Sequence, residues 1–319
     1  MLRAVLVSVI ALFLSAAMPM VLLQGQTDAQ TEDRLLIIKM ERQEANEIDE
    51  IPEIRLKTGE NILTMPLETY LTGVVLAEMP ISFHEEALKA QAVAARTFSV
   101  RRMQNNKHEG FDLCDQSDCC QAWSDQSWLR KKLGAEWEQY WEKASRAVEA
   151  TKGQVLTYNG EWIDAVYFSC SGGSTETAAA VWGSDVPYLQ TVESPGEETA
   201  SKYRSEKEVS VDEFRKLLPE ASLPDNPAGW FGAVTHTAGG GVETMEIGGE
   251  SYTGTELRSR FGLNSTKFTV AIEEGTIVFE VFGYGHRVGM SQYGANAMAN
   301  QGKTYAEILQ HYYPGTVLE

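Results

Sequence analysis

Residues 70–102 read YLTGVVLAEMPISFHEEALKAQAVAARTFSVRR, and this stretch decides how we interpret the rest of the chain. Its first part is apolar and ends at Glu78, because Pro80 disfavours helical geometry at the residue before it. In the connector that follows, Ser82 and Glu85 have the spacing of a capping box. We therefore predict a second helix over residues 83–103. The residues of its buried stripe are Ala87, Ala90, Ala94 and Phe98.

Glu78 is the first candidate for a chemical role. It lies between Ala77 and Met79 at the end of a helix, so its carboxylate has apolar neighbours. Such neighbours disfavour the charged form and raise the pKa of a carboxyl group. A raised pKa is what a general acid needs near neutral pH. The alternative interpretation is an ordinary surface glutamate at a helix end.

The flanking segments indicate an α+β fold around a central cleft, because strands and helices follow one another without regular alternation. The helix that carries Glu78 is predicted to start at Pro66. The strands expected before it are 35–40, 51–56 and 61–65. Later segments with clear signals are a helix over 127–151, a hairpin turn at Asn159-Gly160 and a hairpin over 267–282. We expect a smaller subdomain at about 197–275, beginning in a charged surface loop over 196–208.

The N-terminus predicts export. Residues 4–23 are twenty residues without a charge, a length that suits a membrane span. A cleaved signal peptide is the competing interpretation, because Ser15-Ala16-Ala17 offers small residues for cleavage. We expect an anchor over residues 1–24, a tether over 25–34 and an extracytoplasmic body over 35–319. The net charge of −18 and the lack of a basic patch exclude nucleic-acid binding.

Two further polar segments can share a cleft with Glu78. Segments 169–176 and 283–295 are rich in glycine and in neutral hydrogen-bonding side chains. Neutral donors and acceptors beside aromatic rings suit a carbohydrate better than a phosphate. The candidate binding residues in and near these segments are Ser169, Ser171, Thr175, Tyr188, His286 and Gln292. Ser171 lacks the G-x-S-x-G frame of a serine hydrolase.

Three of the four cysteines lie within seven residues, close to a histidine. A disulfide scaffold would spread its cysteines along the chain. The cluster therefore suits a metal site, although export also permits a disulfide.

Four spaced motifs resemble the stage II sporulation protein D family. They are the segment from Tyr70 to Thr97, YFSCSGGSTE at 167–176, Pro187-Tyr188-Leu189 with Ser194-Pro195, and GHRVGMSQYGA at 285–295. The resemblance implies a membrane-anchored lytic transglycosylase. Such an enzyme cleaves peptidoglycan between N-acetylmuramic acid and N-acetylglucosamine during spore engulfment. It also implies a place in the mother-cell membrane facing the forespore septum.

The resemblance further implies partners and a catalytic residue. The partners are stage II sporulation protein P, an amidase that removes stem peptides first, and stage II sporulation protein M. The catalytic glutamate of the family falls on Glu78. A lytic transglycosylase needs essentially one carboxylate, whereas most glycoside hydrolases need two. From their positions on the helix, we expect Lys89, Gln91 and Arg96 to contact the sugar. The alternative is a non-catalytic glycan-binding scaffold or an enhancer of a cell-wall amidase.

Some members of the family resemble this chain in carrying His and Cys at this loop, and they bind zinc near the active site, whereas other members lack the cysteines. The spacing favours His108, Cys114 and Cys120 as ligands, with a fourth position open for water or a carboxylate. Cys119 can replace Cys120, because adjacent residues of an extended loop point in opposite directions. A disulfide from Cys114 or Cys119 to Cys170 is the rival arrangement.

Overall fold

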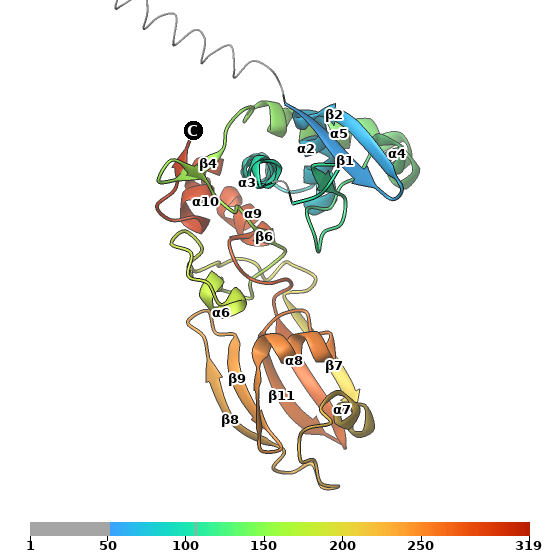
Figure 1. The fold of residues 1–319 in the computed structure, drawn as a ribbon, viewed down its shortest axis with the longest axis vertical. Coiled ribbons are helices and arrows are strands. Elements are labelled where there is room, and N and C mark those ends of the chain that lie inside the picture. The colour runs from blue at the N-terminus through green and yellow to red at the C-terminus, as the bar shows by residue number, and fades with distance from the viewer. Residues whose placement is uncertain (1–51, 106) are drawn as a thin grey trace, which may run out of the picture. The chain divides into compact units, whose positions relative to one another are not determined.

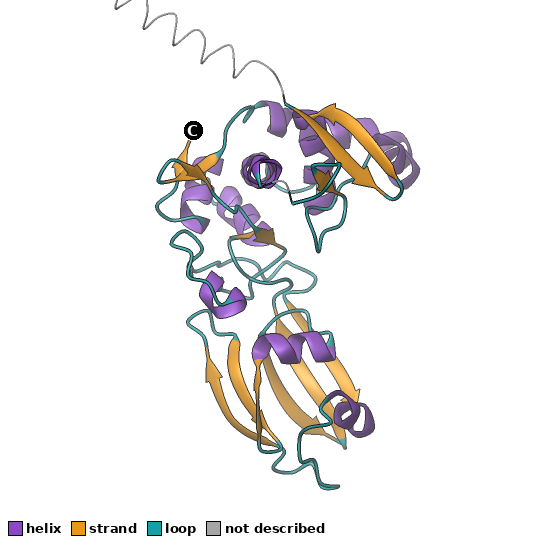
Figure 2. Cartoon of the chain, viewed as in Figure 1, coloured by secondary structure: helices purple, strands orange, loops and turns teal. Residues whose placement is uncertain are grey.

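The computed structural model describes residues 52–105 and 107–319 (Figure 1). The expected anchor over 1–24, the tether over 25–34 and the strand over 35–40 lie outside the described residues. Within the described ranges, no helix combines the length and the apolar character needed to cross a bilayer. Helices and strands mix along this part of the chain, which confirms the α+β class (Figure 2).

The chain forms one run of helices interrupted by short strands and by a strand-rich segment. The helices are α2 (Leu67–Glu78), α3 (Glu85–Gln104), α4 (Gln126–Leu133), α5 (Trp137–Glu149), α6 (Ala178–Trp182), α7 (Val211–Leu217), α8 (Gly254–Phe261), α9 (Gln292–Asn300) and α10 (Tyr305–Tyr312). The longer strands are β1 (Glu53–Thr58), β2 (Asn61–Pro66), β7 (Arg204–Ser210), β8 (Phe231–His236), β9 (Val242–Ile247), β10 (Glu250–Thr253), β11 (Lys267–Glu273) and β12 (Thr276–Phe282). The short strands are β3 (Leu113–Cys114), β4 (Leu156–Tyr158), β5 (Glu161–Trp162), β6 (Tyr167–Phe168), β13 (Met290–Ser291) and β14 (Val317–Leu318).

Helix α3 is the centre of the main hydrophobic core. Every residue from Ala87 to Ser99 except Lys89 is buried, and the helix packs against α2, α5, α9 and α10. Figure 1 looks along its axis. The predicted stripe of small residues is buried, and the helix is buried on its other faces as well. The small side chains explain this, because they allow four helices to approach one backbone closely.

Helix α2 ends at the predicted residue. Met79 is extended, with φ −119° and ψ 142°, and Pro80 follows it. Earlier in α2, Gly73 is required by a close approach, since a Cβ there would lie 2.3 Å from the Trp123 indole nitrogen. The loop that contains Trp123 therefore packs directly on the helix that presents Glu78.

Two local predictions were wrong. His84, not Ser82, caps α3, and its Nδ1 accepts a hydrogen bond from the Glu86 amide at 3.2 Å. The segment expected as one helix over 127–151 is broken at Gly134, whose φ of +59° ends α4 before α5 begins. Glycine tolerates this left-handed backbone, whereas most residues do not.

A second hydrophobic core belongs to the strand-rich segment. Its buried residues run from Val209 to Val281. The antiparallel sheets β11-β12-β7 and β10-β9-β8 carry this core together with α7 and α8. Asn159 and Gly160 both have positive φ, as expected for a tight hairpin turn between β4 and β5.

Arg96 has a structural role that the sequence prediction missed. It is 2% exposed, and its guanidinium donates to the two carboxylate oxygens of Glu68 at 2.9 and 2.6 Å. It also donates to the backbone carbonyls of Val148 and Gln154, each at 3.2 Å. The side chain thus ties α2, α3 and the end of α5 together. The expected sugar contact by Arg96 is corrected here, because its nitrogens are already bonded inside the protein.

We expect Arg96→Met to lower the free energy of unfolding by about 3 kcal/mol, because the change leaves Glu68 and two carbonyls without their partner. Arg146→Met is the matched control, since Arg146 on α5 is exposed and pairs with an exposed Glu142. The control should cost less than about 1 kcal/mol. Urea unfolding followed by circular dichroism measures both values. Equal effects of the two substitutions would contradict the role given to Arg96.

Candidate active site

Glu78 is held by two segments that are distant in the sequence. One carboxylate oxygen, Oε1, accepts a hydrogen bond from the Ala122 amide at 2.9 Å. The other, Oε2, accepts one from Nε2 of Gln292 at 3.3 Å. Burial raises the pKa of Glu78 above its ordinary value, although both hydrogen bonds act in the opposite direction. The group is therefore held on both oxygens, and its raised pKa brings it closer to what a proton donor needs near neutral pH.

The loop that holds Ala122 is fixed by its neighbour Gln121. The Gln121 side chain donates to the Tyr70 hydroxyl at 3.1 Å and to the Ser99 hydroxyl at 2.9 Å. Its carbonyl oxygen accepts from the Tyr167 hydroxyl at 2.7 Å. These bonds join α2, α3 and β6 directly behind the Ala122 amide. The backbone amide that donates to Glu78 is thus held in place by hydrogen bonds to core residues.

Gln292 reaches Glu78 because it is the first residue of α9, where Ser291 is the helix cap. Its side chain is 5% exposed, and its Nε2 also lies 3.5 Å from Oε1 of Gln91 on α3. Gln91 is fully buried, so it supports Gln292 from behind. The predicted contact between Gln91 and the sugar is therefore wrong, because a fully buried side chain cannot reach a ligand.

Glu197 is a buried carboxylate that the sequence prediction missed. It was expected in a charged surface loop, but it is 0% exposed. It accepts hydrogen bonds from the amides of Ser171, Gly172 and Gly173. It also accepts from the hydroxyls of Ser171, Ser194 and Ser291. The charged residues that follow Glu197 made this segment look like a surface loop. The only sequence signal for a buried role was its closeness to the Ser194-Pro195 motif.

Glu176 and Arg287 form a second buried link between the two glycine-rich loops. Both are at most 1% exposed, and NH1 of Arg287 lies 3.0 Å from Oε1 of Glu176. The guanidinium also donates to the carbonyls of Ser171, Ser174 and Gly239. Breaking a buried pair of this kind would leave an uncompensated charge. The two motifs therefore form one unit that positions Gln292.

Two cavities meet at Glu78 and Ser169. The larger, of about 720 Å³, we call the helix cavity. It lies against the connector after α2 and against α4 and α5, and its lining includes Ile81, Ser82, Trp128, Lys132, Tyr140, Lys143 and Tyr293. The smaller, of about 460 Å³, we call the loop cavity. Its lining includes Arg102, Cys119, Gln121, Tyr167, Phe168 and His286. Glu78 thus lines both cavities. This position suits a reactive group that acts in the middle of a polymer chain, with one part of the polymer in each cavity.

The other predicted binding residues divide into two groups. Ser169 and His286 line the cavities. Ser171, Thr175 and Tyr188 are buried and support the loops through hydrogen bonds to Glu197, Gln190 and Asp164. These three have no access to the two cavities, because neither lining includes them.

Lys89 is engaged away from the site, in ion pairs with Glu85 and Glu86. His286 packs between Phe168 and Trp182. Burial and the nearby Arg258 charge lower the pKa of His286 to about 4. His286 is therefore neutral at pH 7 and serves as a hydrogen-bonding group rather than as an acid.

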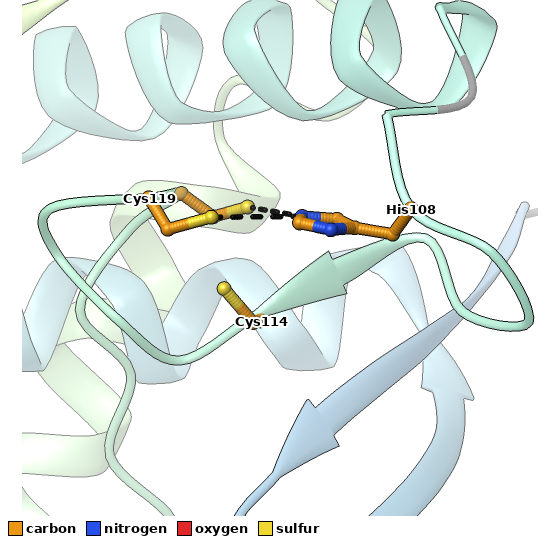
Figure 3. Close-up of side chains that lie close together, drawn as sticks. His108, Cys114 and Cys119 are labelled. Atoms are coloured by element: carbon orange, nitrogen blue, oxygen red, sulfur yellow. Dashed lines mark hydrogen bonds between the residues drawn. The ribbon is translucent and has the colours of Figure 1, made fainter.

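The cysteine loop brings four possible metal ligands together. The ligand atoms of His108, Cys114, Cys119 and Cys120 all lie within 4.8 Å of one another (Figure 3). The His108 Nε2 atom lies 3.2 Å from the Cys120 sulfur and 3.8 Å from the Cys119 sulfur. The expectation that either Cys119 or Cys120 would join the cluster is corrected, because both do. All four cysteines are free thiols, and Cys170 is outside the cluster.

The cluster is connected to Glu78 through the backbone. Cys120 is followed by Gln121 and then by Ala122, whose amide donates to the Glu78 carboxylate. On the other side, Lys57 and Cys114 are paired in the parallel strands β1 and β3. Anything that fixes the four ligand side chains therefore also fixes the Ala122 amide.

The comparisons agree with these motifs. The SpoIID family profile, described as stage II sporulation protein, matches residues 57–158. Stage II sporulation protein D of Bacillus amyloliquefaciens is 41% identical over 261 residues, which are 81% of this chain and 75% of that protein. The protein of the same name in Bacillus subtilis strain 168 is 41% identical over 262 residues, covering 81% and 76%. The amidase enhancer of that strain is 32% identical, and this chain covers 40% of it.

We expect Gln292→Leu to raise the pKa of Glu78 further, because the lost amide hydrogen bond stabilises the charged form. NMR titration of isotope-labelled glutamate carboxyl groups measures this shift. Gln301→Leu is the control, because it removes an exposed amide at the other end of α9. A fall in the Glu78 pKa, or an equal shift in the control, would show that Gln292 does not contact the carboxylate as described.

Proposed function

This chain belongs to the stage II sporulation protein D family, and on that basis we propose that it is a peptidoglycan lytic transglycosylase. Its substrate would be denuded glycan strands, cleaved between N-acetylmuramic acid and N-acetylglucosamine during spore engulfment. The observation that carries the proposal is a single carboxylate with a raised pKa, held on both oxygens, where two cavities meet.

Glu78 supplies both proton transfers in the proposed reaction. As an acid it donates its proton to the glycosidic oxygen, and the bond from that oxygen to the muramic acid anomeric carbon breaks. As a base it then takes the proton of the C6 hydroxyl of the same sugar, whose oxygen bonds to the anomeric carbon. The products are a 1,6-anhydro-muramic acid end and a free N-acetylglucosamine end, and no water is consumed. The second proton transfer returns Glu78 to its starting form.

One carboxylate is sufficient for this reaction, whereas hydrolysis of the usual kind needs a second. Glu78 is the only carboxylate among the residues that line the helix cavity. The loop cavity adds one, Asp118, which is exposed. Gln292 and the Ala122 amide keep the carboxylate oriented as its charge changes. His286, Tyr167 and Ser169 are the neutral polar groups beside it and suit sugar hydroxyl and acetamido groups.

A second candidate function is a glycan-binding scaffold that activates a cell-wall amidase. The observation in its favour is the 32% identity to a protein named amidase enhancer. Both functions would use the same two cavities. We place the enzyme first because the pKa of Glu78 and its two hydrogen bonds would have no purpose in binding alone.

We further propose the setting in which this activity takes place. An anchor over 1–24 would hold the body over 35–319 outside the cytoplasm, in the mother-cell membrane facing the forespore septum. Stage II sporulation protein P would remove stem peptides first, and stage II sporulation protein M would assemble with both proteins. The support for this setting is the family membership and the apolar run over residues 4–23.

We propose that His108, Cys114, Cys119 and Cys120 hold a zinc ion. Tetrahedral zinc places thiolate and imidazole donors about 4 Å apart. The four ligand atoms lie within 4.8 Å of one another, close to that separation. The sequence predicted three protein ligands and an open fourth position. Four protein ligands would fill every position of a tetrahedral ion, so we assign the ion a structural role. When bound, it would supply rigidity to the loop that carries the Ala122 amide.

We expect Glu78→Gln to lower the release of anhydro products from denuded glycan by at least about a hundredfold, because proton transfer is lost. Folding and glycan binding should remain intact, since glutamine preserves the shape and one acceptor oxygen. Mass spectrometry of the soluble products measures the effect. Glu85→Gln at the exposed start of α3 is the control and should cleave normally. Unchanged release of anhydro products by Glu78→Gln would contradict the assignment of Glu78 as the catalytic acid and base.

We expect metal analysis of the purified protein to find about one zinc ion per chain, the stoichiometry of a four-ligand structural site. Cys114→Ser should lose the zinc and lower the melting temperature, because the loop from His108 to Ala122 loses its cross-link. Cys170→Ser is the matched control and should retain the metal. Zinc-free wild-type protein, or equal loss in both variants, would exclude the site.

A further inference from the structure

The helix cavity is positively charged in a strongly acidic protein. The chain carries a net charge of −18, yet this cavity is lined by Lys132 and Lys143 against the single carboxylate of Glu78. Within the described ranges, Lys132 and Lys143 form no ion pair, as is true of most lysines there. What sets these two apart is that they share one cavity, whose lining holds no carboxylate except Glu78. This local excess of positive charge favours an anionic ligand.

Lys132 lies on an aromatic platform. Its ammonium is 4.3 Å from the centre of the Trp128 ring, and Trp128 is 44% exposed at the cavity wall. Tyr140 and Tyr293 line the same cavity. An exposed indole offers a flat apolar surface for the C–H face of a sugar ring. The ammonium lies over this ring, so it can reach a charged substituent of a sugar that packs against the same side chain.

Lys143 holds a second positive charge in the cavity that Glu78 also lines. Its Nζ donates to the carbonyls of Ile81 at 2.5 Å and Phe83 at 2.8 Å, in the connector that follows α2. An ammonium has three N–H donors, so one is left for an acceptor in the cavity. Lys143 is thus held by the backbone, whereas Lys132 is exposed and free to follow a ligand.

We propose that the helix cavity binds the sugar that carries a carboxylate, and that Lys132 recognises that group. In peptidoglycan this sugar is N-acetylmuramic acid, so the identity of the ligand rests on the proposed function. Its lactyl group is a carboxylate only after the stem peptide has been removed, because the peptide converts it into a neutral amide. The charge in the cavity therefore selects denuded strands. The sugar that closes the anhydro ring lies in the helix cavity, and the leaving N-acetylglucosamine lies in the loop cavity.

The test compares two oligosaccharides of equal length by calorimetry on full-length Glu78→Gln protein, which we expect to bind without cleaving. One alternates N-acetylglucosamine with peptide-free N-acetylmuramic acid, and the other contains N-acetylglucosamine alone. The lactyl-bearing compound should bind more tightly by on the order of tenfold, the size of a charge-assisted hydrogen bond. Adding Lys132→Gln should abolish this preference and leave binding of the other compound unchanged.

Two control variants isolate the charge and its place. Lys132→Arg keeps the charge and should retain the preference. Lys131→Gln removes the neighbouring charge, which does not line the helix cavity, and should also retain it. The proposal is overturned if Lys132→Gln keeps the preference, if Lys131→Gln loses it equally, or if neither compound binds.

The same materials separate this proposal from the proposed function. If wild-type protein releases no anhydro products but the lactyl preference depends on Lys132, the enzyme assignment fails and the recognition site stands. If anhydro products form and no preference is found, the recognition site fails and the enzyme stands.

Discussion

The hydrogen bonds to the two oxygens of Glu78 are the constraint on which the site depends. Their donors, Ala122 and Gln292, are 44 and 214 residues away in the sequence. A partly buried carboxylate favours its neutral form, and two fixed donors keep the charged form accessible without moving it. Each donor is held by a separate buried network, so the protein fixes the reactive group by fixing its partners. The two cavities meet at the point where these segments come together around the carboxylate.

The supporting networks differ in how they compensate buried charge. Glu197 has no cation among its hydrogen-bond partners and is satisfied by backbone amides and serine hydroxyls, which join the two glycine-rich loops. Arg96 and Arg287 are each paired with a glutamate and also bonded to carbonyls. Removing one member of such a network leaves a buried charge unsatisfied, which costs more than the bond contributed. The fold therefore has little tolerance for substitution of these buried charged residues.

Local rules predicted the local features of this fold. Pro80 marked the end of α2 at Glu78, Asn159-Gly160 marked a hairpin, and the alanines of α3 marked the core. Features that depend on long-range contacts were not predictable. Glu197 lies in a charged segment whose sequence is typical of a surface loop. Its burial depends on the neighbouring Ser194 and on Ser171 and Ser291, which come from two other segments. Cys119 and Cys120 were treated as alternatives because an extended loop was assumed, whereas the actual turn directs both sulfurs to His108.

Product analysis in water labelled with heavy oxygen tests the central claim most directly. Denuded glycan strands would be digested with the purified protein, and the new chain ends would be examined by mass spectrometry. The account predicts 1,6-anhydro-muramic acid ends without heavy oxygen, because the sugar's own C6 hydroxyl is the nucleophile and Glu78 handles both protons. Reducing ends that carry heavy oxygen would contradict it, since they require hydrolysis by water.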